Sequence, residues 1–158
     1  MHNRIYQLTP EPVNADQYIT ESDFYDHWFV GSIADYVSDN CNKKADIERL
    51  GNRKGYRVAS DEFGAYLEVY SKEEYFAAAF ARFSDALESI KNCTLSDFAR
   101  GLDMWHLKDS YEEKFGDYVY ASDDASDDDD SLMTFDAFVR NAAEGQKYYI
   151  GGTVDYHW

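Results

Sequence analysis

The chain is poor in several residue types, and each shortage excludes a class of protein. Its two cysteines, Cys41 and Cys93, are too few for a disulfide framework and do not form a C-x-x-C pair. We therefore expect both to be reduced thiols. No stretch approaches the roughly 18 apolar residues of a membrane-spanning helix, and residues 1–8 lack the apolar centre of a secretory signal. These absences predict a cytoplasmic protein that does not bind a membrane.

Basic residues are scarce as well. Fifteen Lys and Arg oppose thirty-one Asp and Glu among 158 residues, which gives a formal net charge of −16. Proteins bind DNA and RNA through basic groups that displace counterions, so this charge excludes direct nucleic-acid binding. It favours a partner that is itself basic, such as a protein that binds nucleic acid. The alternative is that the acidity serves solubility alone.

Patterns that mark active sites are missing too. The chain has no G-x-S-x-G elbow, phosphate-binding loop or dinucleotide fingerprint. No histidine is spaced i, i+4 from another, as in a helical metal site. The Asp-rich segment, residues 122–131, fails the EF-hand pattern, because Leu132 and Phe138 stand where glycine and glutamate are needed. We predict no catalytic residue, no cofactor and no metal site, with loose binding of a divalent cation left open.

The chain does contain enough apolar material for a folded core. Hydrophobic residues make up 44% of it and aromatic residues 17%, and the length fits one domain. Cap, turn and periodicity signals divide the chain into strands and helices. The expected strands cover residues 4–8, 56–59, 65–70 and 118–120. The expected helices cover residues 20–37, 46–50, 72–90, 94–105, 111–115 and 134–139.

The longest predicted helix carries a stripe of apolar residues at spacings of four and three, which predicts that this side faces the core. The stripe consists of Phe76, Phe80, Phe83, Leu87 and Ile90. The next helix contains Gly101, which predicts a break near residues 101–103. Both expectations, the core-facing stripe and the helix break, are based on the local sequence alone.

Two short strand patterns near the end of the chain, residues 148–150 and 153–156, flank Gly151-Gly152. This arrangement predicts a β-hairpin with a two-residue turn. Altogether we expect an α+β fold, with helices packed on a small, mainly antiparallel sheet. It forms a single domain, residues 1–158, with a flexible acidic loop at about residues 122–131.

Charge is unevenly distributed. Eleven acids lie between residues 103 and 130, whereas six basic residues lie in the stretch 43–57. The basic stretch can pair with acids internally, form a dimer contact or make a second binding surface. The acidic stretch is predicted to contact a basic partner with tyrosines as anchors, or to be a solvated loop. The predicted partner-binding residues are Tyr111, Glu112, Glu113, Asp117, Tyr118, Tyr120, Asp123, Asp124, Asp127, Asp128, Asp129 and Asp130.

A resemblance covers roughly the last 25 residues. Phe135-Asp136-Ala137-Phe138-Val139-Arg140, Tyr148-Tyr149 and Gly152-Thr153-Val154 are similar to the closing segment of ArdA-type antirestriction proteins. The whole composition resembles that of acidic DNA-mimic inhibitors from phages and mobile elements, the antirestriction and anti-CRISPR proteins. The resemblance implies that the chain acts in the bacterial cytoplasm and blocks a restriction or CRISPR nuclease by occupying its DNA channel. It implies no catalytic residue.

The sequence therefore predicts an acidic inhibitor, not an enzyme, that binds a basic nucleic-acid-binding protein or nuclease complex by nucleic-acid mimicry. Two alternatives stay open. An immunity protein that neutralises a nuclease toxin would present the same kind of acidic surface. A small enzyme, or an acidic interaction module without mimicry, is the other alternative. A homodimer is compatible with all of these functions.

Overall fold

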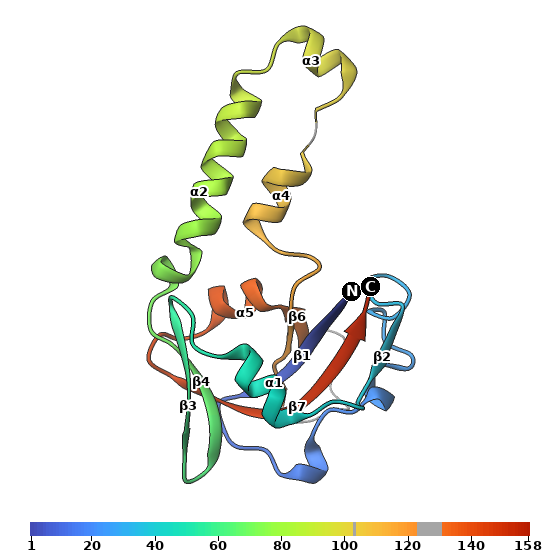
Figure 1. The fold of residues 1–158 in the computed structure, drawn as a ribbon, viewed down its shortest axis with the longest axis vertical. Helices are drawn as coiled ribbons and strands as arrows, with labels where there is room; N and C mark the ends of the chain where they lie inside the picture. The colour runs from blue at the N-terminus through green and yellow to red at the C-terminus, as the bar shows by residue number, and fades with distance from the viewer. Residues whose placement is uncertain (103, 123–130) are drawn as a thin grey trace.

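The centre of the computed structural model, which describes residues 1–102, 104–122 and 131–158, is a seven-stranded sheet (Figure 1). Its order is β3-β4-β7-β1-β5-β6, and β2 pairs with β7 off this path. Only β1 and β5 are parallel among these pairs, which confirms the predicted α+β class. The strands are β1 (His2–Thr9), β2 (Tyr36–Ser38), β3 (Tyr56–Asp61), β4 (Gly64–Val69), β5 (Tyr118–Tyr120), β6 (Leu132–Thr134) and β7 (Lys147–His157).

Side-chain caps begin three of the helices where the sequence predicts them, at Ser71, Thr94 and Thr134. The predicted break is confirmed, because a helix ends at Gly101 with a φ of 96°. The helix predicted over residues 111–115 is wrong, since α4 ends at the first of them and the next residue is extended. The helices are α1 (Lys43–Leu50), α2 (Lys72–Lys91), α3 (Leu95–Arg100), α4 (Trp105–Tyr111), α5 (Phe135–Asn141) and the 3-10 turns η1 (Ala15–Gln17) and η2 (Glu21–Phe24).

Hydrophobic clusters lie on both faces of the sheet. On the first face, α1, α5 and the start of α2 cover Tyr6 and Val119, both fully buried. On the second face, residues 19–37 cover Ile5 and Val154, also fully buried. Successive residues of β1 therefore point into different clusters, as the alternation of a strand requires.

The helix predicted over residues 20–37 is wrong. The structure has only η2 there, followed by turns and β2. Gly31 has a φ of +89°, which a helix does not allow. Phe29 is fully buried, whereas Tyr25, which a helix would place one turn earlier on the same side, is 68% exposed. Irregular backbone allows this segment to lie along the sheet and cover a wide area, which a single helical stripe would not do.

The predicted hairpin over residues 148–156 is also wrong, because β7 runs unbroken through Gly151 and Gly152. Its register with β1 shifts by one residue here, so both glycines lie opposite Gln7 in a β-bulge. A Cβ on Gly151 would come within 2.4 Å of Gln7 Oε1, and one on Gly152 within 2.7 Å of Ile19 N. The glycines permit close packing and do not form a turn.

An arm made of α2, α3 and α4 projects from the sheet (Figure 1). α4 packs beside α2, yet no residue of α2 is buried. The prediction that its apolar stripe faces the core is therefore wrong: Phe80 is 68% exposed and Leu87 is 49% exposed. Only the start of α2 reaches the first cluster, through Tyr75 and Phe76 in its first two turns.

Candidate functional site

Two arginines of the basic stretch pair with acids inside the molecule. Asp117 Oδ1 accepts from Arg49 Nη1 at 2.9 Å and from the backbone N–H of Arg4 at 2.9 Å. Arg57 Nη2 lies 2.8 Å from Glu68 Oε2 across the β3–β4 ladder. Internal pairing, one of the three interpretations of this stretch, is thus confirmed for Arg49 and Arg57. Asp117 is no free acid, because Arg49 compensates its charge.

Two of the three tyrosines predicted as anchors lie in the core. Tyr118 and Tyr120 are each 3% exposed, since β5 lies between β1 and β6 and both of its faces are covered. This corrects the prediction, because neither ring offers a surface to a partner. Tyr111 is 56% exposed, but it lies on the arm with the Arg140 guanidinium 4.2 Å from its ring centre.

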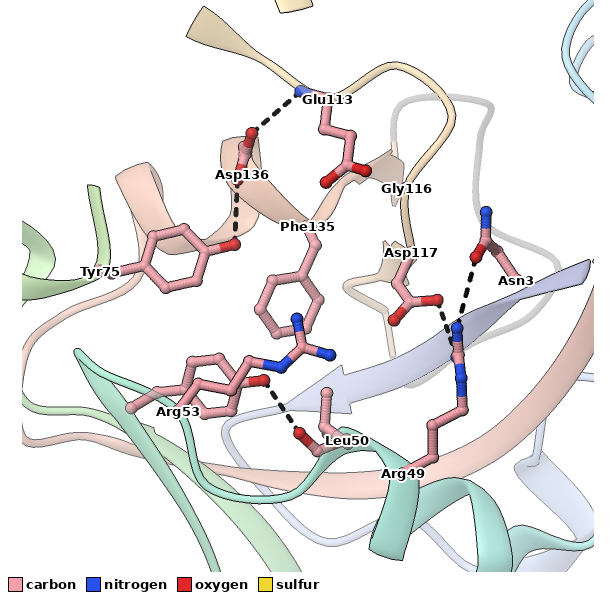
Figure 2. A pocket seen from close by; sticks show the side chains of 11 residues that line it. Asn3, Arg49, Leu50, Arg53, Tyr75, Glu113, Gly116, Asp117, Phe135 and Asp136 are labelled. Atoms are coloured by element: carbon pink, nitrogen blue, oxygen red, sulfur yellow. Dashed lines mark hydrogen bonds and ion pairs between the residues drawn. The ribbon is translucent and has the colours of Figure 1, made fainter. Parts of the chain in front are cut away.

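The two predicted glutamates lie beside α5. Glu112 Oε1 accepts from Thr134 Oγ1 at 2.9 Å. The backbone N–H of Glu113 donates to Asp136 at 3.0 Å, and its side chain lines a pocket (Figure 2). The other predicted acids lie outside the described residues, as does the predicted flexible loop apart from its ends. They are Asp123, Asp124, Asp127, Asp128, Asp129 and Asp130.

This pocket lies between the arm and the sheet and has a volume of about 190 Å³. Burial raises the pKa of Glu113, and the neighbouring carboxylates, Asp136 first among them, raise it further. Tyr75 donates its hydroxyl proton to Asp136 at 2.9 Å. On the opposite side Arg49 and Arg53 complete the charged lining (Figure 2).

A carboxyl group with a raised pKa in a pocket is a feature of many acid–base sites. The described lining of this pocket, however, contains no histidine, cysteine or serine that would act as a nucleophile or its base. Its volume is also below the roughly 300–1,000 Å³ of most small-molecule sites. The geometry gives no reaction to assign to it.

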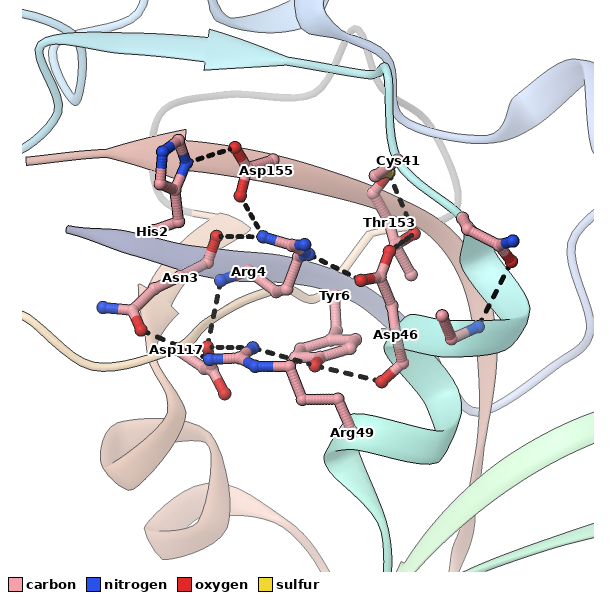
Figure 3. Close-up of polar contacts among 12 residues, drawn as sticks. His2, Asn3, Arg4, Tyr6, Cys41, Asp46, Arg49, Asp117, Thr153 and Asp155 are labelled. Carbon is pink, nitrogen blue, oxygen red and sulfur yellow. Dashed lines mark hydrogen bonds and ion pairs between the residues drawn. The ribbon is translucent and has the colours of Figure 1, made fainter.

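A buried ionic network fastens β1 to α1 and β7 (Figure 3). Arg4 Nε donates to Asp46 at 2.6 Å, and Arg4 Nη1 donates to Asp155. Asp46 is 3% exposed and also accepts from Thr153 Oγ1 at 2.9 Å. Cys41 Sγ donates to the Thr153 carbonyl at 2.9 Å, and burial raises the pKa of this thiol. A reactive cysteine needs a lowered pKa, so Cys41 does not have the environment of a reactive thiol.

A second part of the chain, which was not among the predicted partner-binding residues, contains acids without any basic residue. Residues 5–42 contain seven acids and no Lys or Arg. Residues 10–40 of this stretch form the irregular segment that follows β1 and packs on the second face of the sheet, and we call them the acidic cover. Its acids are Glu11, Asp16, Glu21, Asp23, Asp26, Asp35 and Asp39. A run of 38 residues without a cation was the signal that would have identified it.

Exposed aromatic rings stand among these acids. Tyr25, Trp28 and Tyr36 are 68%, 45% and 47% exposed. The Tyr25 hydroxyl donates to Glu21 at 2.9 Å, and this hydrogen bond raises the pKa of Tyr25. Tyr36 stacks on His157 with 5.3 Å between ring centres. Tyrosine and tryptophan often act as anchors at protein interfaces, and carboxylates bind arginine. This segment presents both kinds of residue side by side.

Buried Gln7 joins the acidic cover to the start of the Asp-rich segment. Its Nε2 donates to the carbonyls of Gln17 and Ser122, each at 3.1 Å. Its Oε1 accepts from the backbone N–H of Ile19 at 3.2 Å and of Gly152 at 2.9 Å. Ser122 immediately precedes the first aspartates of that segment. Ser122 therefore lies beside the acidic cover.

Comparison with other proteins assigns no family. No protein-family model matches the chain, and no curated protein and no solved structure is significantly similar to it. Among the described residues, no three His, Cys, Asp or Glu are grouped to hold a metal ion. No helix of the described chain is long and apolar enough to cross a membrane. The candidate site is therefore the acidic cover, on the basis of its charge and exposed rings.

Proposed function

We propose that the protein is an acidic inhibitor whose acidic cover occupies the nucleic-acid site of a basic enzyme, a restriction or CRISPR nuclease. The separation of charge carries this proposal. Cations such as Arg4, Arg49 and Arg57 are paired with acids of the same molecule, whereas the cover holds seven acids and no Lys or Arg.

The chemistry of such a surface suits a groove that binds DNA. A duplex presents one phosphate about every 1.7 Å of its axis, so the groove that receives it is lined by Lys and Arg. Carboxylates accept the same charge-assisted hydrogen bonds, and arginine binds them in a bidentate manner. Tyr25 and Trp28 add exposed faces on which a guanidinium can stack. Opposite fields would also speed the encounter.

Competition with DNA tests the proposal. A fluorescent duplex is bound to a panel of restriction enzymes and guide-loaded CRISPR nucleases, and the protein is titrated in. We expect release of the duplex and loss of cleavage for at least one member of the panel, because inhibitor and DNA share one site. Duplex retained by every member, with cleavage unchanged, would contradict the proposal.

A matched pair of variants tests the position of the interface. The first variant neutralises three exposed acids of the cover: Asp16→Asn, Asp26→Asn and Asp39→Asn. The control neutralises three exposed acids elsewhere: Glu48→Gln, Glu62→Gln and Glu73→Gln. We expect displacement by the first variant to weaken by roughly tenfold and the control to stay near wild type. Equal weakening in both would show that net charge acts without a defined face.

A further inference from the structure

The arm carries an apolar face that the rest of the described molecule leaves uncovered. Between α2 and α4 lies a hollow of about 420 Å³, lined mainly by Phe76, Phe80, Phe83 and Tyr111. Phe80 is 68% exposed and Tyr111 is 56% exposed. Apolar patches of this kind on a folded protein mark interaction surfaces, because covering them removes apolar area from water.

The base of this face is held in place. The Arg140 guanidinium lies over the rings of Phe76 and Tyr111, 4.4 Å and 4.2 Å from their centres, and it donates to the Tyr111 carbonyl. Lys72 Nζ donates to the Arg140 carbonyl at 2.6 Å. The rings are therefore fixed before a partner arrives, which lowers the entropy lost on binding.

The charge around the hollow permits contact between two acidic chains. Its lining includes the cations Lys72 and Arg140 and no acid, and residues 75–84 of α2 contain no acid either. A second copy of this chain has a net charge of −16, and most contacts between two copies would bring carboxylates together. This face allows two copies to meet without that repulsion.

The spacing of the stripe is symmetric. Phe76, Phe80, Phe83 and Leu87 follow one another at intervals of four, three and four residues. An antiparallel second α2 then places Phe76 opposite Leu87 and Phe80 opposite Phe83, as in an antiparallel coiled coil. Reciprocal pairing of this kind is what a two-fold dimer requires.

The arm as a whole exposes an apolar area close to that of a standard interface, and Phe80 and Leu87 are the part of it that lies on α2. The large exposed apolar side chains of the arm are Phe80, Leu87, Leu95, Phe98, Met104, Trp105 and Tyr111. At about 100 Å² of exposed surface each, they offer roughly 700 Å², close to the ~800 Å² that each partner contributes to a standard interface. α2 alone, with 20 residues, is about 30 Å long.

We propose that the arm is a dimerisation element, in which α2 packs antiparallel against α2 of a second copy around Phe80 and Phe83. The inference does not depend on the proposed inhibitory function. It assigns the apolar stripe of α2 to an interface between copies instead of to the core of one chain.

Sedimentation velocity over a range of concentrations tests the dimer. We expect wild type at twice the chain mass of 18.3 kDa and Phe80→Asp as a monomer with an unchanged circular dichroism spectrum. The matched control is Phe63→Asp, which alters a phenylalanine of similar exposure, 64% against 68%, in the β3–β4 turn. The control should remain dimeric. The proposal would be overturned if wild type were still a monomer at a concentration of about 100 μM, which would place its dissociation constant above that value. A dimeric Phe80→Asp variant would overturn it as well.

Disulfide trapping tests the antiparallel register. In a background with Cys41→Ser and Cys93→Ser, a mixture of the Phe76→Cys and Leu87→Cys chains should form a cross-linked heterodimer on oxidation. Each variant alone should cross-link much less, because residue 76 faces residue 87. Efficient cross-linking of each variant with itself would indicate a parallel arrangement and overturn this register.

Discussion

At the scale of single residues, Gln7 shows how one buried amide organises the candidate site. It makes four hydrogen bonds, to Gln17, Ile19, Ser122 and Gly152, and it is fully buried. The backbone N–H groups of Ile19 and Gly152, whose bonds to Gln7 are buried, would otherwise be left unsatisfied at a cost of about 1–3 kcal/mol each. A single side chain thus fixes where the acidic cover, Ser122 and β7 meet.

Whereas Gln7 stabilises the fold, the charged form of Glu113 destabilises it, because the pocket disfavours an ionised carboxylate. Its raised pKa means that the folded state favours the protonated carboxyl. The contribution to stability is therefore complete below the ordinary value of 4.5 and is lost as the pH rises through the folded-state pKa. As the pH rises, ionising this half-buried carboxyl next to Asp136 therefore costs more free energy in the folded state than in the unfolded chain.

We accordingly expect Glu113→Gln to raise the urea midpoint at about pH 7 and to leave it unchanged at about pH 3.5, where the carboxyl is protonated in both states. The measurement is equilibrium unfolding at both pH values. Glu62→Gln, an exposed acid in the β3–β4 turn, is the control for a general loss of negative charge. A gain at neutral pH that Glu62→Gln reproduces in full would contradict the role of the pocket.

At the scale of elements, β7 depends on the two glycines of its bulge. Gly152→Ala places a Cβ 2.7 Å from both the N and the O of Ile19, which are backbone atoms and cannot rotate away. We expect unfolding free energy to fall by about 2 kcal/mol or more. Gly116→Ala, whose Cβ has its three nearest atoms in the flexible Glu113 side chain, the first at 3.0 Å, should cost less. Denaturant unfolding measures both, and equal effects would contradict the bulge as described.

Elements with local signals are predictable from this sequence. Caps at Ser71, Thr94 and Thr134 fix three helix starts, and Gly101 ends α3. These features depend on neighbouring residues alone, so no tertiary contact overrides them. The α+β class follows from their order along the chain.

Elements decided by distant contacts were mispredicted. The local sequence of Gly151-Gly152 predicts a turn. The bulge that forms there instead depends on Gln7, which is more than 140 residues away and lies opposite the two glycines. The apolar stripe that includes Phe80 was predicted to face the core. Helical spacing shows that one face of a helix is apolar, but it does not show what covers that face. The acidic cover was missed for a related reason: a search for clustered acids favours dense runs, whereas the cover is distinguished by its missing cations.

At the scale of the whole molecule, two surfaces of different chemistry are separate. The acidic cover packs on the second face of the sheet, whereas the apolar face belongs to the projecting arm (Figure 1). Salt screens the first kind of contact and not the second. Each surface therefore has its own response to ionic strength.

We expect affinity for the nuclease target to fall by roughly tenfold or more between about 50 mM and 500 mM salt, because its contacts are between carboxylates and basic groups. Dimerisation through the arm should hold or strengthen over the same range, since its contacts are apolar and screening reduces repulsion between acidic copies. Titrations of both equilibria in one salt series give the comparison. Target affinity that is flat with salt would contradict an acidic interface.

The pairing of β1 with β7 also sets the order in which the protein can fold. These strands are central neighbours in the sheet and join residues 2–9 to residues 149–157. Residues 149–157 must leave the ribosome before β1 gains this partner, so β1 stays without it while all the elements between the two strands are made. Contacts this distant in sequence slow folding, because a long loop closes before any of them forms. The arm, built from local contacts between α2 and α4, can form first, and nascent chains would then expose its apolar face before their acidic cover is assembled.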